Sequence, residues 1–176
     1  VEVVSVIVDD HVAVTDSSFT VGRRGVAGTV FVEKIAGAVA ERGADLAEVA
    51  RLARKTDDNA RTMGLALTSC TVPAVGHPTF DLPENQIELG VGIHGEAGRE
   101  RTTRVGAREL VNRMVDPIVD ALSLTHGEEV ICLVNGLGAA HPLELDLVFG
   151  EVVADLDRRG IAIARPMVGT FVTALD

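Results

Sequence analysis

The stretch Glu88-Leu-Gly-Val-Gly-Ile-His-Gly-Glu-Ala-Gly98 places one histidine among four glycines at the end of a short apolar run. The apolar run predicts a strand, and the glycines predict a loop that follows it. Because glycine has no Cβ, such a loop can adopt positive φ angles and lets a ligand approach the imidazole of His94 closely. We therefore place the candidate chemistry at His94, with Gly92, Gly95 and Glu96 as secondary candidates. The alternative is a glycine-rich turn whose histidine hydrogen-bonds a backbone carbonyl.

The segments on both sides of this stretch predict an α/β protein. Apolar runs without helical period predict strands over 1–8, 62–71, 87–93, 130–135, 161–165 and 171–175. Apolar residues and alanines before Gly43 predict a helix over 26–42, and a capping box of Asp45 with Glu48 predicts another over 45–55. Three-and-four apolar spacing predicts a helix over 107–122, kinked or split at Pro117, with Leu110, Met114 and Ile118 facing inward. Pro142 and Gly160 mark the ends of a fourth helix over 142–159. Helices separate some strands and plain loops separate others, which favours a mixed β-sheet with helices packed on it.

The composition is typical of a globular domain and narrows the partners. The chain has 176 residues, 47% of them hydrophobic and 24% charged. Its net charge of −10 argues against nucleic acid and anionic membranes as partners, and its apolar runs are too short for a membrane span. Cys70 and Cys132 fit no paired metal spacing, so we expect buried free thiols in a reducing compartment and a cytoplasmic location.

Three further polar segments are weaker site candidates. Asp9, Asp10 and Asp16 follow the first predicted strand, where acidic residues cap loops and helices more often than they bind metals. Gly22-Arg-Arg-Gly25 precedes a predicted helix, and we interpret it as helix packing, with anion binding as the alternative. The arginine-rich segment 99–104 predicts a solvated connection, with a phosphate or acidic partner as the alternative, and the turn at 135–138 lies where open sheets bind ligands.

Four stretches together resemble one known family, the dihydroxyacetone kinase K subunit, which binds the ketose in that phosphotransfer system. Gly92-Ile-His-Gly-Glu-Ala-Gly98 is similar to the family signature Gly-Ile-His-Gly-Glu-Pro-Gly, with Ala97 in place of the proline. The other stretches are 8–14 with Asp16 and Ser17, 22–30, and 134–138, in the same order as in the family. A longer connection at 138–142, which contains His141, departs from the family pattern.

The resemblance implies that His94 binds a short ketose covalently. A neutral imidazole nitrogen can add to a ketone carbonyl, but the nitrogen of the adduct then carries no hydrogen, so water cannot leave to form an imine. The adduct therefore stops at a hemiaminal. Such an adduct distinguishes ketones from polyols such as glycerol, and it leaves a terminal hydroxyl of the ketose available for phosphorylation.

By the same resemblance, the chain is the ketose-binding subunit of a dihydroxyacetone-type kinase in glycerol metabolism. The ketose is a triose or a tetrulose. The phosphoryl donor, ATP with Mg²⁺ or a phosphoenolpyruvate-derived relay, is expected on a nucleotide-binding, L-type partner subunit or domain, with no cofactor and no metal on this chain. A homodimer is implied. The alternative is a regulatory or ligand-sensing relative that binds the ketose without phosphorylating it.

The resemblance also implies that more sequence precedes Val1. The family's base and its second histidine lie upstream of the position that corresponds to Val1, so we expect a fragment that is inactive alone. In the two-lobed subunit that the resemblance implies, residues 1–60 end the first α/β lobe and residues 61–176 form the second, which carries the His94 loop.

Overall fold

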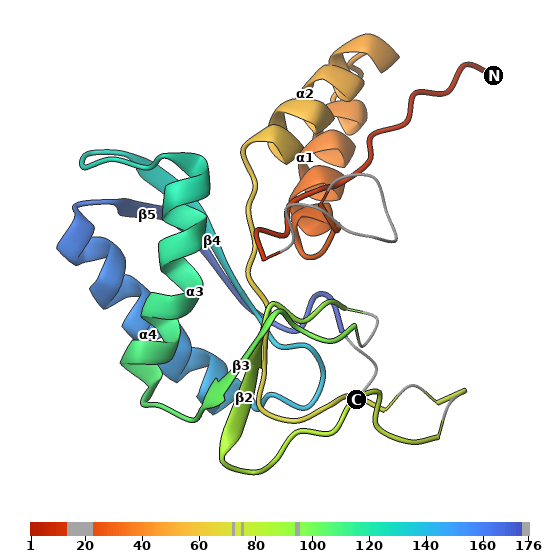
Figure 1. Cartoon of the computed structure of the whole chain (residues 1–176). Helices are drawn as coiled ribbons and strands as arrows, with labels where there is room; N and C mark the ends of the chain where they lie inside the picture. The colour runs from red at the N-terminus through yellow and green to blue at the C-terminus, as the bar shows by residue number, and fades with distance from the viewer. Residues whose placement is uncertain (14–22, 72, 75, 94–95, 174–176) are drawn as a thin grey trace.

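The computed structural model describes residues 1–13, 23–71, 73–74, 76–93 and 96–173 (Figure 1). The elements are, in chain order, α1 (Gly28–Glu41), α2 (Leu46–Asp58), β1 (Leu65–Ala66), β2 (Gln86–Leu89), β3 (Glu100–Thr103), α3 (Ala107–Leu122), β4 (Glu129–Asn135), α4 (Pro142–Arg159) and β5 (Ala162–Gly169). The predicted α/β class is confirmed. None of the helices in the described ranges is both long and apolar enough to cross a membrane.

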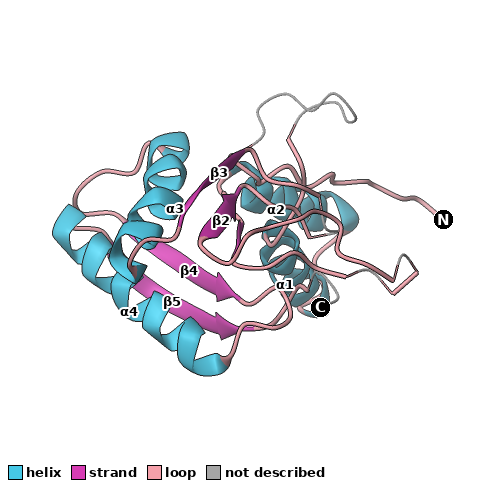
Figure 2. Ribbon diagram, turned by 60° about the horizontal axis from the view of Figure 1, so that its bottom comes forward, coloured by secondary structure: helices cyan, strands magenta, loops and turns pink. Residues whose placement is uncertain are grey.

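The strands pair in both directions, but in two separate sheets. β1, β2 and β3 form an antiparallel sheet, and β4 and β5 form a parallel pair joined through α4. In Figure 2, α3 and α4 lie together on one side of β4 and β5. The core between these layers consists of buried aliphatic side chains, namely Val111, Val115, Val134, Leu145, Val152, Leu156 and Ile161.

α1 and α2 pack on each other and form a second group, apart from α3 and α4 (Figure 1). Between the two groups lies a largely apolar cavity of about 1100 Å³. Its walls include Phe31 and Ile35 of α1, Met114 and Ile118 of α3, and Leu133 of β4. The apolar faces of the helix pair and of the parallel sheet are therefore turned toward each other without filling the space between them.

The start of α1 is held by a buried carboxylate. Asp10 is fully buried, and its Oδ1 accepts the N–H of Val26 at 2.7 Å while its Oδ2 accepts the N–H of Gly28 at 2.9 Å. The Thr62 hydroxyl donates to the same Oδ2 at 2.6 Å. Asp10 thus caps the start of α1, as predicted for this acidic cluster. Its carboxylate occupies the position at the helix N-terminus that a bound anion would need. Asp16 lies outside the described residues.

Several predicted strand boundaries were wrong, because strands depend on partners elsewhere in the chain. Residues 1–8 form no strand and leave Val3 and Ile7 exposed, because no described strand lies beside them. The predicted strand over 62–71 shrinks to β1, and 171–173, the described part of the strand predicted over 171–175, form a bend and no strand. The segment expected as a charged loop contains β3, whose polar sequence hid it; its Arg101 pairs with Glu88 on β2 at 2.8 Å.

Helix boundaries were predicted more accurately, with two corrections in α3. The helix is continuous through Pro117, which excludes a split at this residue, while the other expected outcome, a kink, stays a prediction. Its most buried side chains are Val111 and Val115, which pack in the core with α4, whereas Met114 and Ile118 line the cavity. α4 begins at Pro142 with His141 as its cap: Nδ1 accepts the N–H of Leu143 at 3.2 Å.

Candidate functional site

The sheet formed by β2 and β3 holds both ends of the predicted ligand loop. Arg99 donates its N–H to the carbonyl of Leu89 at 2.8 Å and so closes the loop at its base. Further along, Gly92 donates to the carbonyl of Glu96 at 3.2 Å. The structure thus brings together Gly92 and Glu96, two of the secondary candidates, and their role in binding stays a prediction. His94 and Gly95 lie outside the described residues, so their roles stay predictions.

The glycines of this loop allow the chain to pack closely on itself. Gly90 has a φ of +82°, and a Cβ there would stand 2.7 Å from the Cβ of Ala13. At Gly92, a Cβ would overlap the carboxylate of Glu96 and stand 3.2 Å from Nη1 of Arg24. The space left by the missing side chain at Gly92 is therefore filled by the protein's own charged groups, where the sequence suggested room for a ligand.

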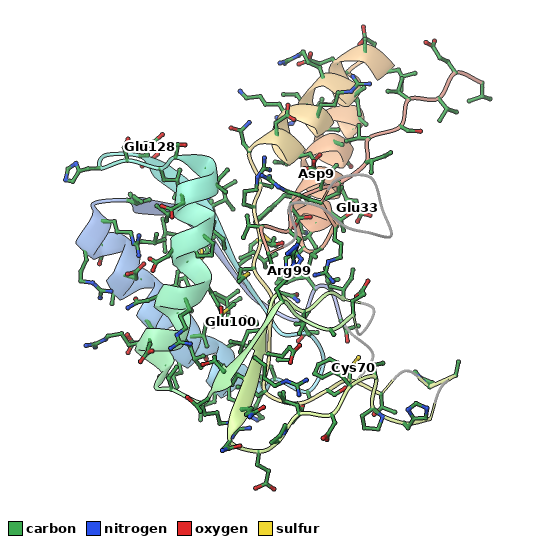
Figure 3. All side chains as sticks on the ribbon, viewed as in Figure 1. Asp9, Glu33, Cys70, Arg99, Glu100 and Glu128 are labelled. Carbon is green, nitrogen blue, oxygen red and sulfur yellow. The ribbon has the colours of Figure 1, made fainter. Side chains whose placement is uncertain are left out.

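Arg24 reaches this loop from the segment before α1. Its Nη2 donates to the carbonyl of Gly90 at 2.8 Å. Burial lowers the pKa of Arg24, the nearby carboxylate of Glu96 raises it, and the nearby guanidinium of Arg99 lowers it. Two guanidinium groups and one carboxylate therefore lie close together at the loop. Figure 3 shows Arg99 in the space between the start of α1 and the adjoining ends of β2 and β3. Sequence analysis missed this role, because nothing local links Arg24 to Gly90.

A neutral histidine, His11, lies close to Arg24 and Glu96. His11 is fully buried, and its Nε2 accepts the N–H of Gly64 at 3.4 Å. Burial, with a smaller contribution from Arg24, lowers the pKa of His11 to about 4, so the ring is uncharged at neutral pH. Since Nε2 accepts, Nδ1 carries the proton; it has no partner among the residues that the structure describes. The local sequence signal for this histidine is its position directly after Asp9 and Asp10.

Two other predicted candidates have structural partners. Asn135 accepts the N–H groups of Phe171 and Val172 with its Oδ1, at 2.8 and 3.0 Å, so its amide fixes the turn after β5. Arg101 on β3 forms an ion pair with Glu88.

Within the described part of the chain, no group of three or more His, Cys, Asp or Glu side chains is arranged to hold a metal ion. The loop between β2 and β3 is therefore the site best supported by both sequence and geometry.

The model of one protein family, described as the Dak1 domain, matches residues 1–176. The chain belongs to the Dak1 domain family. This confirms the resemblance drawn from the four sequence stretches. This Dak1 domain is also 43% identical, over 176 residues, to the "PTS-dependent dihydroxyacetone kinase 1, dihydroxyacetone-binding subunit DhaK" of Listeria innocua. The match covers 100% of this chain and 54% of that subunit, so this Dak1 domain spans about half the length of its relative.

Two solved structures share the fold of this Dak1 domain. The "dihydroxyacetone kinase operon co-activator Dha-DhaQ" superposes with a TM-score of 0.89 and 29% identity, covering 97% of this chain and 53% of that one. The dihydroxyacetone kinase from C. freundii, in complex with AMP-PNP and Mg²⁺, superposes with a TM-score of 0.78 and 34% identity, covering 97% of this chain and 31% of that one. The same fold thus occurs in a dihydroxyacetone kinase and in a dihydroxyacetone kinase operon co-activator.

Proposed function

We propose that this Dak1 domain is the ketose-binding part of a dihydroxyacetone-type kinase. In this proposal, His94 holds a short ketose, a triose or a tetrulose, as a hemiaminal, and the terminal hydroxyl of the ketose receives a phosphoryl group. The observation that carries the proposal is the 43% identity to a dihydroxyacetone-binding subunit over the whole length of this chain. The chemistry requires an uncharged imidazole with an accessible lone pair, on a loop whose conformation is fixed.

The surroundings of the loop support this chemistry. A histidine can add to a carbonyl only when its ring is neutral, and the carbonyl oxygen gains negative charge as the new C–N bond forms. The cationic groups of Arg24 and Arg99 beside the loop favour a neutral imidazole and a developing negative oxygen. Glu96 opposes both effects, so the balance between these charged side chains sets the reactivity of the loop.

The donor and the remaining catalytic groups lie elsewhere in this proposal. ATP with Mg²⁺, or a phosphoenolpyruvate-derived relay, acts from an L-type nucleotide-binding subunit or domain, and the base and second histidine come from sequence upstream of Val1. Residues 1–60 then end one lobe and residues 61–176 form another, within a homodimeric, cytoplasmic protein of glycerol metabolism. The C. freundii kinase, crystallised with AMP-PNP and Mg²⁺, supports a nucleotide donor. The isolated 176-residue chain should not transfer phosphate.

A second function is favoured by one observation. The Dha-DhaQ co-activator superposes with a TM-score of 0.89, against 0.78 for the C. freundii kinase. A ligand-sensing protein that binds the ketose without phosphorylating it would need the same loop. The two functions differ in phosphoryl transfer alone, so a binding experiment followed by a turnover experiment separates them.

The deciding experiment is native mass spectrometry with and without dihydroxyacetone. We expect a mass gain equal to one ketose per chain, lost in His94→Ala and absent when glycerol replaces the ketose. The matched control is His77→Ala, because His77 is an exposed loop histidine. A gain that persists in His94→Ala would contradict the proposed site. Phosphorylation of the bound ketose by the protein as it is naturally encoded, on addition of an L-type subunit and its donor, would then select the kinase over the sensor.

A further inference from the structure

Arg24 connects two parts of the chain that are remote in sequence. Its Nη2 donates to the carbonyl of Gly90, 66 positions further along the chain, at 2.8 Å. Its Nη1 lies 3.2 Å from the point where a Cβ of Gly92 would stand, and the Glu96 carboxyl carbon lies 2.7 Å from that same point. One guanidinium therefore touches the first half of the loop and faces the carboxylate of its second half, and residue 94 stands between those halves in the sequence.

The segment that carries Arg24 is itself fixed in place. The backbone carbonyl of Arg24 accepts the N–H of His11 at 3.0 Å, and Val26 donates its N–H to the buried carboxylate of Asp10 at 2.7 Å. A side chain that starts from an anchored backbone loses less conformational freedom when it binds the loop. The guanidinium also offers several fixed donors in one plane, which suits a simultaneous contact with a carbonyl and a carboxylate.

We propose that Arg24 is a positioning residue for the loop between β2 and β3, where it fixes the backbone at Gly90 and Gly92 and opposes the charge of Glu96. This inference rests on the proposed function of His94 and adds a residue to it. Without Arg24, the carbonyl of Gly90 loses its charged donor, and Arg99 is left to oppose the negative charge of Glu96. Among the described residues, His11, Asp10, Glu96 and Arg99 are charged or titratable groups close to Arg24 or His11, and Glu88, paired with Arg101, lies against Gly98 at the base of the loop.

The test compares Arg24→Ala and Arg24→Lys with the control Arg23→Ala, in the protein as it is naturally encoded. Arg23 is the adjacent arginine, and its side chain has no hydrogen bond or ion pair among the described residues. The affinity for dihydroxyacetone is measured from adduct occupancy in native mass spectra over a range of ketose concentrations and pH values. Hydrogen exchange of the amides of Gly90, Gly92 and Arg99 is measured without ketose.

We expect Arg24→Ala to weaken the adduct about tenfold or more, as for the loss of a charge-assisted hydrogen bond. We also expect its pH midpoint of adduct formation to move upward by about one unit, because removing a cation favours a protonated imidazole. Arg24→Lys should restore most of the midpoint, since it keeps the charge, but little of the affinity, since it lacks the planar fork. The three loop amides should exchange faster in Arg24→Ala than in the unmodified protein, and their exchange rates should be unchanged in Arg23→Ala.

Two results would overturn the inference. In the first, Arg24→Ala binds the ketose with the affinity and pH midpoint of the control. In the second, the loop amides exchange at the same rate in Arg24→Ala and in Arg23→Ala. If Arg24→Ala fails to fold, Arg24→Lys tests the inference instead. An unshifted pH midpoint with reduced affinity for the ketose in Arg24→Lys would support it, and an unchanged affinity would overturn it. Absence of any adduct in the unmodified protein would instead refute the proposed function and with it the role in ketose binding, and the exchange rates alone would then decide whether Arg24 anchors the loop.

Discussion

Asp10 and Gly28 are in contact at the start of α1: Oδ2 of Asp10 accepts the N–H of Gly28 at 2.9 Å, and a Cβ on Gly28 would stand 2.7 Å from the Asp10 Cγ. The carboxylate can approach the helix this closely because position 28 has no side chain. The same carboxylate binds the Thr62 hydroxyl, so one buried group joins the first helix to the segment that leads into β1.

Gly28→Ala should therefore destabilise the protein, although alanine is the better helix former. We expect a loss of about 2 kcal/mol in the free energy of unfolding, because the buried carboxylate must shift and lose hydrogen bonds. The matched control is Gly37→Ala in the same helix, where nothing lies within 4 Å of the added Cβ. That variant should be stabilised by up to about 1 kcal/mol. Urea unfolding measures both; equal effects of the two substitutions would contradict the contact.

His11 should make the stability of the protein depend on pH below neutrality. Burial lowers the pKa of His11 from 6.5 to about 4 in the folded protein, so as the pH falls below 6.5 the unfolded chain binds a proton that the folded chain does not. This contribution to stability is fully present above pH 6.5 and is lost progressively as the pH falls toward 4. Between pH 7.5 and pH 5 the loss should be about 2 kcal/mol.

Urea unfolding of the unmodified protein and of His11→Gln at both pH values measures this difference. Glutamine does not titrate, so the variant should lack the contribution of His11 and show a smaller loss on acidification. His77→Gln removes an exposed histidine and should leave the pH dependence unchanged. An identical pH dependence in His11→Gln and the unmodified protein would show that His11 titrates normally.

Cys132 should be inert toward thiol reagents in the folded protein. Burial raises the pKa of Cys132 to about 11, so the thiolate fraction at pH 8 is on the order of one in a thousand. In Cys70→Ser, which leaves Cys132 as the single cysteine, maleimide labelling at pH 8 should be slow in buffer and rapid in denaturant. Labelling at equal rates in both conditions would contradict the burial of this thiol.

His141 should stabilise α4 through its cap. Its Nδ1 accepts the N–H of Leu143, and Glu144 in turn accepts the N–H of His141 at 2.8 Å. His141→Ala should cost about 1 kcal/mol in the free energy of unfolding, and His141→Ser should recover most of it, because serine is a preferred N-cap. If alanine and serine at this position give the same unfolding midpoint, the cap contributes nothing. The result would also assign a role to the longer connection before α4, for which the sequence suggested none.

The sequence by itself determined the features that depend on neighbours within a few residues. Apolar spacing, N-terminal caps and terminating glycines predicted all four helices nearly to their ends. The N-cap at Asp45 was visible because Asp45 and Glu48 lie three positions apart; Glu48 donates its N–H to Asp45 at 2.9 Å. The glycine pattern around His94 indicated the loop, and four short stretches together indicated the family. These features are local because helix hydrogen bonds and caps join residues that are close in the chain.

Only the tertiary structure decided which distant segments meet at the loop. The contacts of Arg24 with Gly90 and of His11 with Gly64 join residues separated by 66 and 53 positions. The sequence next to these residues does not predict the contacts. For the same reason residues 1–8 formed no strand while polar residues formed β3: a strand exists only where a partner accepts its hydrogen bonds, and that partner is chosen by the packing of the whole chain.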